Sequence, residues 1–181
     1  SSGIEKVKEA SQLGEALDRA FRFDRRVLVE QGLDVRELEV AALGGDDPTV
    51  SVVGEVKVAG EFYDFHDKYV NGRSVAVIPA ELSPAVAEEV RDCAYRAYRA
   101  LDCYGMARVD FFQDRPSGRI FLNEINLIPG FTSISMYPKL MEASGIPYGT
   151  LLERLVDLAL ERHRRQQAKR HDFQSGSDWF A

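Results

Sequence analysis

The stretches 105-GMARVDFF-112 and 121-FLNEINLIPGFTSISMYPKL-140 decide how this chain folds. Each begins with a short run of apolar residues of the kind that forms β-strands. The run DRPSG at 114–118 lies between them, and its proline, glycine and aspartate are typical of a chain reversal. The sequence therefore predicts a hairpin with strands at 105–112 and 119–126.

One face of this hairpin collects polar side chains. Residues two apart lie on the same side of a strand, so Arg108 and Asp110 share a face. The same rule groups Glu124 with Asn126 and places Phe121 on the other side. An arginine, two carboxylates and an amide would then gather together, and such oxygen donors indicate a magnesium-type site. The competing interpretation is a solvated face with an ordinary ion pair, which the R-x-D and E-x-N pairs alone would favour.

The loop that follows the hairpin favours a binding site. Pro129 and Gly130 form a turn, and hydroxyl side chains follow at Thr132, Ser133 and Ser135. Glycine exposes its backbone N–H and short hydroxyls donate hydrogen bonds, so this loop suits an oxyanion or a carboxylate. Together with the carboxylate face, the loop indicates a site for a divalent metal and an anionic substrate.

The rest of the chain alternates between helices and strands. Hydrophobic periodicity predicts strands at 27–30, 35–42 and 51–58, and helices at 11–23, from 83 to about 101, and from about 147 onward. The helix at 11–23 is expected to lie on the sheet. The last helix is expected to bury Leu151, Leu152, Leu155, Val156 and Ala159. The segment 59–74 follows neither period and is predicted to be a functional loop. These elements indicate an α/β (α+β) fold.

Composition excludes several classes of protein. The formal net charge of -6 argues against a general nucleic-acid binder, because phosphate recognition relies on Lys and Arg. The spacing of Cys93 and Cys103 favours buried thiols over a disulfide framework or a zinc site. Because no apolar run has membrane-spanning length and the start lacks a signal-peptide pattern, we expect a cytoplasmic protein with no membrane partner. The chain begins on SSG without methionine, and we expect an upstream portion.

The two stretches quoted first are similar, in order and spacing, to the signature of D-alanine:D-alanine ligases. These are enzymes of the ATP-grasp superfamily that use ATP and magnesium to join two D-alanine molecules. The resemblance extends to IEKVK at 4–8, VEQGLDVRELEVAAL at 29–43 and EFYDFHDKYVNGRS at 61–74. It covers nearly the whole chain, to about Leu160.

The resemblance implies an N-terminally truncated ATP-grasp fold, with antiparallel sheets flanked by helices. Residues 1–37 would belong to the central subdomain and carry a phosphate loop, a helix and an adenine hinge strand. Residues 38–165 would form the catalytic subdomain with a mobile loop at 59–74, and 166–181 a basic, flexible tail. Since the upstream portion of the family helps to bind substrate, the 181-residue piece alone is expected to bind nucleotide weakly and to turn over little.

The resemblance also implies a role for individual residues. The metal ligands would be Asp110, Glu124 and Asn126, which would bind two Mg²⁺ or Mn²⁺ ions. The catalytic residues would be Arg108, Gly130, Ser2 and Tyr69. ATP would contact Glu30, Gln31, Leu33, Glu37, Tyr63 and Lys68. The carboxylate of the second D-alanine would be held by Ser135 and the N–H of Met136.

Other functions stay open at this point. His66 lies close to Tyr69 in sequence, so a ligase that joins D-alanine to D-lactate, or another ATP-grasp carboxylate–amine ligase, is the nearest alternative. A nucleotide-binding module without turnover is a second, although the metal set argues against it. The basic stretch 162–170 is interpreted as a solvated helix end rather than a nucleic-acid contact. The resemblance implies a homodimeric full-length protein that serves peptidoglycan synthesis.

Overall fold

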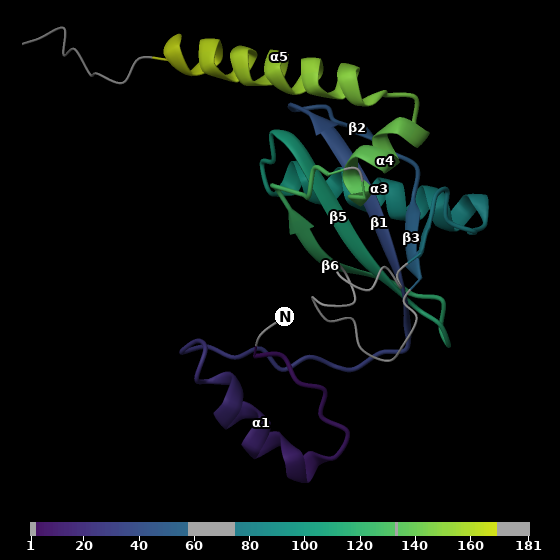
Figure 1. Cartoon of the computed structure of the whole chain (residues 1–181), viewed down its shortest axis with the longest axis vertical. Coiled ribbons are helices and arrows are strands. Elements are labelled where there is room, and N and C mark those ends of the chain that lie inside the picture. Colours follow the sequence, from purple (N-terminus) through teal and green to yellow (C-terminus); the bar gives the residue numbers. More distant parts are fainter. Residues whose placement is uncertain (1–2, 58–74, 133, 170–181) are drawn as a thin grey trace, which may run out of the picture.

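The protein is built around one antiparallel sheet (Figure 1). The computed structural model describes residues 3–57, 75–132 and 134–169. Within them the strand order is β4-β3-β1-β5-β6, and the short β2 also pairs with β1. The strands are β1 (Val35–Gly44), β2 (Thr49–Val50), β3 (Gly54–Lys57), β4 (Val75–Val77), β5 (Gly105–Asp114) and β6 (Ile120–Asn126). The strands predicted at 35–42, 105–112 and 119–126 are confirmed.

Strand β1 forms the centre of the sheet because both of its edges are paired. Along one edge β5 follows it without interruption, from Val35 opposite Asp114 to Gly44 opposite Gly105. Strands β2 and β3 share the other edge, both antiparallel to β1. A strand with both edges paired has its backbone donors and acceptors satisfied along its length, which makes β1 and β5 a rigid platform for side chains.

The strand predicted at 51–58 is interrupted at its start. The hydroxyl of the fully buried Ser51 accepts a hydrogen bond from the Ala41 N–H (2.9 Å) and donates one to the Val52 carbonyl (2.7 Å). A short polar side chain that bonds backbone groups in this way competes with the ladder. The pairing with β1 is therefore divided into β2 before Ser51 and β3 after it.

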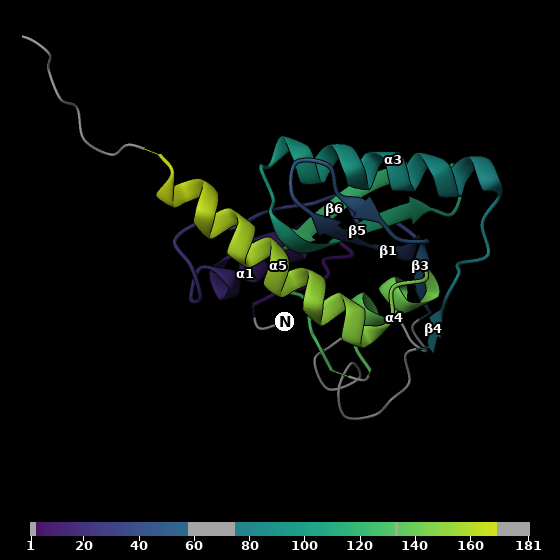
Figure 2. The same ribbon diagram turned by 90° about the horizontal axis from the view of Figure 1, so that it is seen from above.

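Helix α3 (Pro84–Ala100) covers one face of the sheet (Figure 2). It begins as predicted, because the Ser83 side chain accepts a hydrogen bond from the Val86 N–H (3.4 Å) and Pro84 occupies the first turn. The core beneath it contains Leu38, Val40, Val53, Val90, Ala94, Val109 and Phe111. A smaller cluster next to it contains Ala42, Tyr98, Cys103 and Ala107. Both cysteines are free thiols; Cys103 is buried as predicted, whereas Cys93 is only half-buried.

Helices α4 (Met136–Ala143) and α5 (Tyr148–Gln167) lie on the other side of the sheet (Figure 2). The core on this side contains Ala41, Leu43, Val56, Met136, Tyr137, Leu140, Met141, Ile146 and Leu151. Gly54 on β3 lets α4 approach closely, since a Cβ there would lie 2.8 Å from Met136 Cε and 2.9 Å from Leu140 Cδ2. Helix α4 is not among the elements that periodicity predicts, and it fixes the end of the hydroxyl-rich loop.

Helix α5 confirms the predicted last helix but not the residues it was expected to bury. Leu151 is fully buried and Leu155 packs at the margin of the core. Leu152 is 43% exposed, Val156 is 59% exposed, and Ala159 is exposed as well. The stripe of α5 that meets the rest of the protein is narrower than predicted: Leu151, Leu155 and Leu158 pack in the core, and Arg165 further along pairs with Asp46 (3.1 Å). Among the helices described, none is long and apolar enough to cross a membrane.

The region before β1 differs from the prediction. A 3₁₀ turn η1 (Ala10–Gln12) and helix α1 (Leu13–Ala20) occupy the predicted helix, but α1 stands apart from the sheet (Figure 1). The strand predicted at 27–30 is not formed, and Leu28 is 88% exposed. A strand needs a neighbour for its backbone groups, and no strand of the described sheet pairs with 27–30. The apolar run at 27–30 therefore remains an irregular extended segment.

Candidate active site

Three carboxylates lie side by side across the central strands. In the ladders, Glu39 of β1 stands opposite Asp110 of β5, and Asp110 stands opposite Glu124 of β6. One step along, Arg108 stands opposite Asn126. The predicted gathering of an arginine, two carboxylates and an amide is therefore confirmed, and Glu39 adds a third carboxylate. We call Glu39, Asp110 and Glu124 the carboxylate row.

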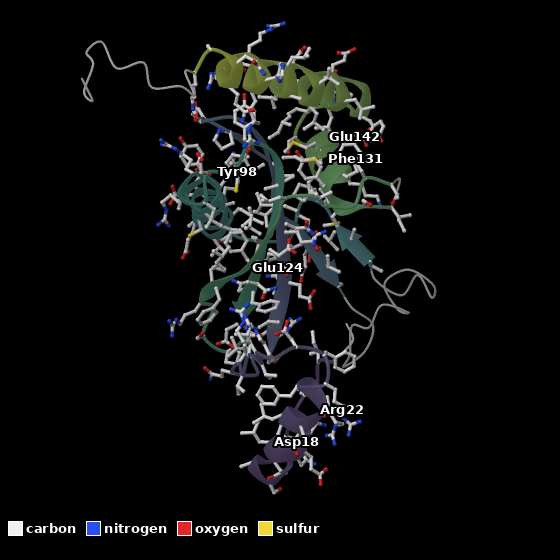
Figure 3. The ribbon with its side chains drawn as sticks, turned by 90° about the vertical axis from the view of Figure 1, so that its left-hand side faces the viewer. Asp18, Arg22, Tyr98, Glu124, Phe131 and Glu142 are labelled. Carbon is white, nitrogen blue, oxygen red and sulfur yellow. The ribbon has the colours of Figure 1, made fainter. Side chains whose placement is uncertain are left out.

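Burial decreases along the carboxylate row. Glu39 is only 7% exposed, Asp110 is half-buried, and Glu124 is exposed near the edge of the sheet (Figure 3). A ligand from solvent therefore reaches the Glu124 end, whereas the Glu39 end is enclosed by the fold. The outer part of the row, at Glu124, is suited to binding a ligand, and the inner part, at Glu39, is suited to holding neighbouring side chains in place.

A β-bulge adjusts the register of the hairpin. Asp110 pairs with Glu124, but the next residue, Phe111, pairs with Leu122, so Asn123 is an extra residue on β6. Strict alternation, which placed Phe121 on the opposite face from Glu124, is wrong at this point. Phe121 pairs with Phe112, which shares its side of β5 with Asp110. The bulge therefore reverses the phase of alternation along β6, so that Phe121 and Glu124 face the same side of the sheet.

Arg108 is held by two of the carboxylates. Its Nε donates to Oδ1 of Asp110 (2.7 Å) and its Nη2 to Oδ2 (2.7 Å), which is a bidentate pair. Its Nε also lies 3.1 Å from Oε2 of Glu39. Burial alone would lower the pKa of this guanidinium, but Asp110, Glu39 and Glu124 together raise the pKa above its ordinary value. Arg108 thus stays cationic at any physiological pH.

The site carries more negative than positive charge. Carboxylates directly opposite each other on neighbouring strands repel, and the row contains two such pairs. Arg108 supplies one positive charge against the three carboxylates of the row. The excess favours the binding of cations between Asp110 and Glu124, where the row is open to solvent.

The residues fit a magnesium site by their chemistry, although they do not form a complete cage. Within the described ranges, no group of three or more His, Cys, Asp or Glu side chains is arranged to hold a metal. Both Asp110 oxygens bond Arg108, and Oδ1 of Asn126 accepts a hydrogen bond from the Ile128 N–H (3.1 Å). Magnesium takes only one or two protein carboxylates and completes its shell with water and phosphate oxygens. Metal binding would require Asp110 and Asn126 to share or exchange these partners.

The loop after β6 folds onto the start of α4. The Ser135 hydroxyl accepts from the Thr132 N–H (3.0 Å) and lies 2.9 Å from the Thr132 hydroxyl. A Cβ on Gly130 would lie 2.8 Å from this Ser135 oxygen, so a larger residue there would displace the Ser135 hydroxyl. Met136 begins α4, and N–H groups in a first helical turn have no carbonyl partner within the helix. Gly130, Ser135 and the Met136 N–H are therefore brought together as predicted.

An open cavity of about 440 Å³ adjoins this loop rather than the carboxylate row. It is lined by Thr132, Pro138, Lys139, Glu142 and Tyr148, and Figure 3 places Glu142 and Phe131 in this region. Phe131 stacks at a tilt against Tyr148, with ring centroids 5.5 Å apart, which ties the loop to α5. The sequence did not identify Lys139 or Glu142, although their spacing of three residues places them on one face of a helix.

The other predicted site residues lie on β1, in the segment before it, or outside the described residues. Glu37 lies on β1 two residues before Glu39, so the two share a face. Glu30 and Gln31 are exposed, and Leu33 is half-buried, in the irregular segment before β1. The remaining predicted residues fall outside the described residues: Ser2, Tyr63, His66, Lys68 and Tyr69. Glu39 was missed, although the alternation in V-R-E-L-E-V places it beside Glu37.

Known proteins resemble this chain in fold and in sequence. The D-alanine–D-alanine ligase from Coxiella burnetii superposes with a TM-score of 0.78 at 39% identity, covering 90% of this chain and 42% of that one. The VanG D-Ala:D-Ser ligase from Enterococcus faecalis gives a TM-score of 0.77 at 38% identity, covering 87% and 46%. These similarities identify the fold as ATP-grasp, with its sheet and flanking helices as predicted.

Sequence similarity narrows the class to one family. The family described as "D-ala D-ala ligase C-terminus" matches residues 1–157. A D-alanine–D-alanine ligase from Prosthecochloris aestuarii is 53% identical over 162 residues, which is 90% of this chain and 45% of that protein. The chain belongs to the D-alanine–D-alanine ligase family and matches its C-terminal part. It spans less than half the length of these relatives.

Proposed function

We propose that the full-length protein is an ADP-forming ligase that joins two D-alanine molecules, with ATP, for peptidoglycan precursor synthesis in the cytoplasm. The carboxylate row beside Arg108 is the observation that carries the proposal. Its excess negative charge suits the divalent ions of a metal–ATP complex, and the chain leads directly from it into a loop suited to substrate anions. The names of the relatives, D-alanine–D-alanine ligases, support the same activity.

Asp110, Glu124 and Asn126 would hold two Mg²⁺ or Mn²⁺ ions. Bound there, the ions would neutralise the ATP phosphates and draw charge from the phosphoryl group in transfer. The chain itself contributes the platform, because these side chains come from two paired strands whose register sets their separation. Glu124 is exposed and is the most accessible of the three to an incoming nucleotide.

The reaction would proceed in two steps. A carboxylate oxygen of the first D-alanine attacks the γ-phosphorus of ATP, so that an acyl phosphate forms and ADP leaves. The amine of the second D-alanine then attacks the acyl carbon, loses a proton, and displaces inorganic phosphate. Arg108 and the Gly130 N–H would donate hydrogen bonds to the oxyanion that forms in this second step. The carboxylates that keep Arg108 cationic also keep its donors available for that task.

Nucleotide binding would use the segment before β1 and the start of that strand. We propose that Glu30, Gln31 and Leu33 contact adenine and that Glu37 contacts the ribose hydroxyls. Glu37 supports this assignment because it lies on the same side of β1 as Glu39 of the carboxylate row. The remaining contacts proposed for ATP and catalysis are Ser2, Tyr63, Lys68 and Tyr69.

The second D-alanine would lie at the loop that connects β6 to α4. Its carboxylate would be held by the Ser135 hydroxyl and the Met136 N–H, next to Gly130. The adjoining cavity has a volume of about 440 Å³, within the range of small-ligand pockets. The shape and the lining of this cavity would then influence which second substrate is accepted. We also propose that the full-length ligase acts as a homodimer.

A different second substrate is the main alternative. The similarity to a structure named D-Ala:D-Ser ligase favours D-serine as one candidate acceptor. D-lactate and other amine acceptors stand beside it, and a nucleotide-binding module without turnover is the alternative of a different class. All but the last would require the same metal and phosphate machinery.

The test is an assay of ADP release by the full-length protein with Mg²⁺ and ATP. D-alanine, D-serine, D-lactate and L-alanine are supplied separately and in pairs with D-alanine. We expect release with D-alanine alone and D-alanyl-D-alanine as the product. Release only in the presence of D-serine or D-lactate would reassign the substrate, and no release with any of them would leave a binding module.

A further inference from the structure

Arg108 has two carboxylate partners with different proposed roles. Asp110 is a proposed metal ligand, yet both of its oxygens already hydrogen-bond the guanidinium at 2.7 Å. Glu39 lies 3.1 Å from Arg108 Nε and is not among the proposed ligands. When Asp110 turns to a metal, Glu39 is the partner that can remain.

The register explains how Glu39 reaches Arg108. Glu39 stands opposite Asp110, so it is the diagonal neighbour of Arg108 across the β1–β5 ladder. Diagonal neighbours are within reach of long side chains. The residue directly opposite Arg108 is Ala41, whose small side chain leaves the guanidinium free to lean toward Glu39. Both residues of the pair belong to the two strands with the longest shared ladder in the described sheet.

Burial separates the two partners further. Glu39 is 7% exposed and Arg108 is 9% exposed, whereas the row opens to solvent toward Glu124. A nearly buried carboxylate is costly to leave without a compensating charge, which favours its keeping the guanidinium beside it. It is also shielded from ions that arrive at the exposed end. Glu39 thus occupies the end of the row that supports Arg108 rather than the end that meets ligand.

Bound divalent cations would act on the position of the Arg108 guanidinium. Divalent cations between Asp110 and Glu124 repel the nearby Arg108 guanidinium, and they compete with it for the Asp110 oxygens. Without another anion beside it, the guanidinium would swing away from the site at the moment when its donors are needed. A carboxylate on the β1 side of Arg108 holds the repelled guanidinium against the row, so that it does not leave the site.

We propose that Glu39 is a positioning residue for Arg108, which keeps the guanidinium in place when Asp110 binds metal. The proposal rests on the ligase function proposed above. Glu39 touches neither substrate nor nucleotide in this account and acts only through Arg108. The role differs from simple charge neutralisation, because it becomes essential only when Asp110 is engaged elsewhere.

Glu55 provides a matched control within the same sheet. It is 2% exposed, lies on β3, and forms a bidentate pair with Arg36 at 2.9 and 2.7 Å. Glu55→Gln therefore removes a buried glutamate from an arginine pair, as Glu39→Gln does, but without touching Arg108. An effect common to both variants reports lost packing or charge balance, and an effect confined to Glu39→Gln reports positioning.

The first experiment observes Arg108 directly in the full-length protein without metal. Arginine Nε–H signals are visible by NMR when an ion pair slows their exchange with water, and the Arg108 signal is assigned by its loss in Arg108→Lys. Asp110→Asn removes the charge of Asp110 and stands in for its engagement by metal. We expect the Arg108 signal to stay protected in Asp110→Asn and in Asp110→Asn/Glu55→Gln, and to be lost in Asp110→Asn/Glu39→Gln. Equal protection in both double variants would overturn the proposal.

The second experiment repeats the measurement with Mg²⁺ and a non-hydrolysable ATP analogue, and compares kinetics. Glu39→Gln should lower kcat about 10–100-fold, the usual effect of residues that orient a metal-site group, with KM for ATP changed less than about threefold. Glu39→Asp should recover part of the loss, and Glu55→Gln should keep kcat within about twofold. Wild-type kcat in a folded Glu39→Gln variant would refute positioning.

The two proposals can fail separately. If the wild-type protein releases no ADP with any substrate, the ligase function fails, while the metal-free NMR comparison still decides whether Glu39 holds Arg108. If turnover is normal but Glu39→Gln leaves both kcat and the protected Arg108 signal intact, the ligase function stands and the positioning role falls. Thermal unfolding of each variant verifies that it is folded, and Glu39→Ala, which also removes the carboxylate, replaces Glu39→Gln if the latter is not.

Discussion

Two arginine–glutamate pairs lie on opposite faces of the same sheet and are built for different purposes. On the α3 side, Arg36 pairs with Glu55 and completes its hydrogen bonds with the Gln113 side chain (3.1 Å) and the Glu81 carbonyl (3.1 Å). On the other side, Arg108 is surrounded by carboxylates that outnumber it. The first group is balanced by neutral acceptors, and the second is left with excess negative charge.

This difference teaches how a buried ion pair can be recognised as structural or functional. Around Arg36, hydrogen bonding to the guanidinium lowers the pKa of Glu55, and neutral acceptors take further hydrogen bonds from Arg36. Around Arg108, the geometry is equally tight, but the charge is unbalanced toward the open end of the row. Tight geometry alone does not mark a site, whereas tight geometry with unbalanced charge does.

The largest expected effect comes from removing the arginine on the functional side. Arg108→Ala should lower kcat about 10²–10³-fold, since one oxyanion donor is lost. The assay is steady-state ADP release with D-alanine in the full-length protein. A kcat within tenfold of the wild-type value would show that Arg108 does not stabilise the oxyanion. The proposed difference in role between Arg108 and Arg36 would then fail.

Stabilisation by bound metal should depend on Asp110, on the Arg108 side of the sheet, and not on Glu55, on the Arg36 side. A ligand at one hundred times its Kd stabilises a folded protein by about 2.7 kcal/mol, so saturating Mg²⁺ with a non-hydrolysable ATP analogue should raise the unfolding temperature. Asp110→Asn should lose most of that increase, and Glu55→Gln should retain it. Calorimetry with and without EDTA measures both, and a full increase in Asp110→Asn would contradict the metal assignment.

Breaking the structural pair should affect stability rather than activity. Glu55→Gln leaves Arg36 partly buried without its anionic partner, and we expect a loss of about 2 kcal/mol in unfolding free energy at pH 7, between the values for exposed and buried pairs. Urea unfolding measures it, with kcat as the control. A large loss of kcat at unchanged stability would mean that the two faces are coupled.

The stability effect of Glu55 should depend on pH in a definite direction. Its pKa is lower in the folded state, through hydrogen bonding to Arg36, so its contribution is complete above the unfolded-state pKa of about 4.3 and is lost as pH falls through the folded-state pKa. The difference between wild type and Glu55→Gln should therefore be constant near neutrality and close below about pH 4. A difference that grows on acidification would reverse the sign and refute the linkage.

The smallest effect is expected at the start of α3. Ser83→Ala removes a capping hydrogen bond that is long at 3.4 Å, so the loss should be near the lower limit for N-caps, about 0.5 kcal/mol. Catalysis should not change, because α3 lies across the sheet from the carboxylate row. This variant shows how much kcat changes when a residue far from the carboxylate row is substituted, and the larger effects on kcat are judged against that value.

The central part of the site could be predicted because its chemistry is local. Alternation along two strands and a five-residue turn were enough to bring Arg108, Asp110, Glu124 and Asn126 to one face. Glu39 was missed because its contact with Arg108 depends on the pairing of β1 with β5, which are more than sixty residues apart in sequence. Local patterns do not specify which distant strands become neighbours.

Other errors have equally physical reasons. The apolar run at 27–30 has strand character, but propensity cannot supply a pairing partner. Helix α4 has only eight residues and contains Pro138, so its periodic signal is short and weak. The exposed side of α5 was assigned to the core because the apolar pattern of the helix is wider than the stripe that packs, and a pattern does not show how much of an apolar face is covered.

The bulge at Asn123 has a consequence for how this hairpin can change. It separates the turn at 114–118 from the part of β6 that carries Glu124 and Asn126, so slippage near the turn can be absorbed before it reaches these residues. Evolution, or a protein engineer, could lengthen the turn or graft a loop there while the carboxylates keep their alignment. Deleting Asn123 would restore regular pairing, with Leu122 opposite Phe111 and Glu124 still opposite Asp110, so the carboxylates would keep their face and the hairpin would lose only this tolerance.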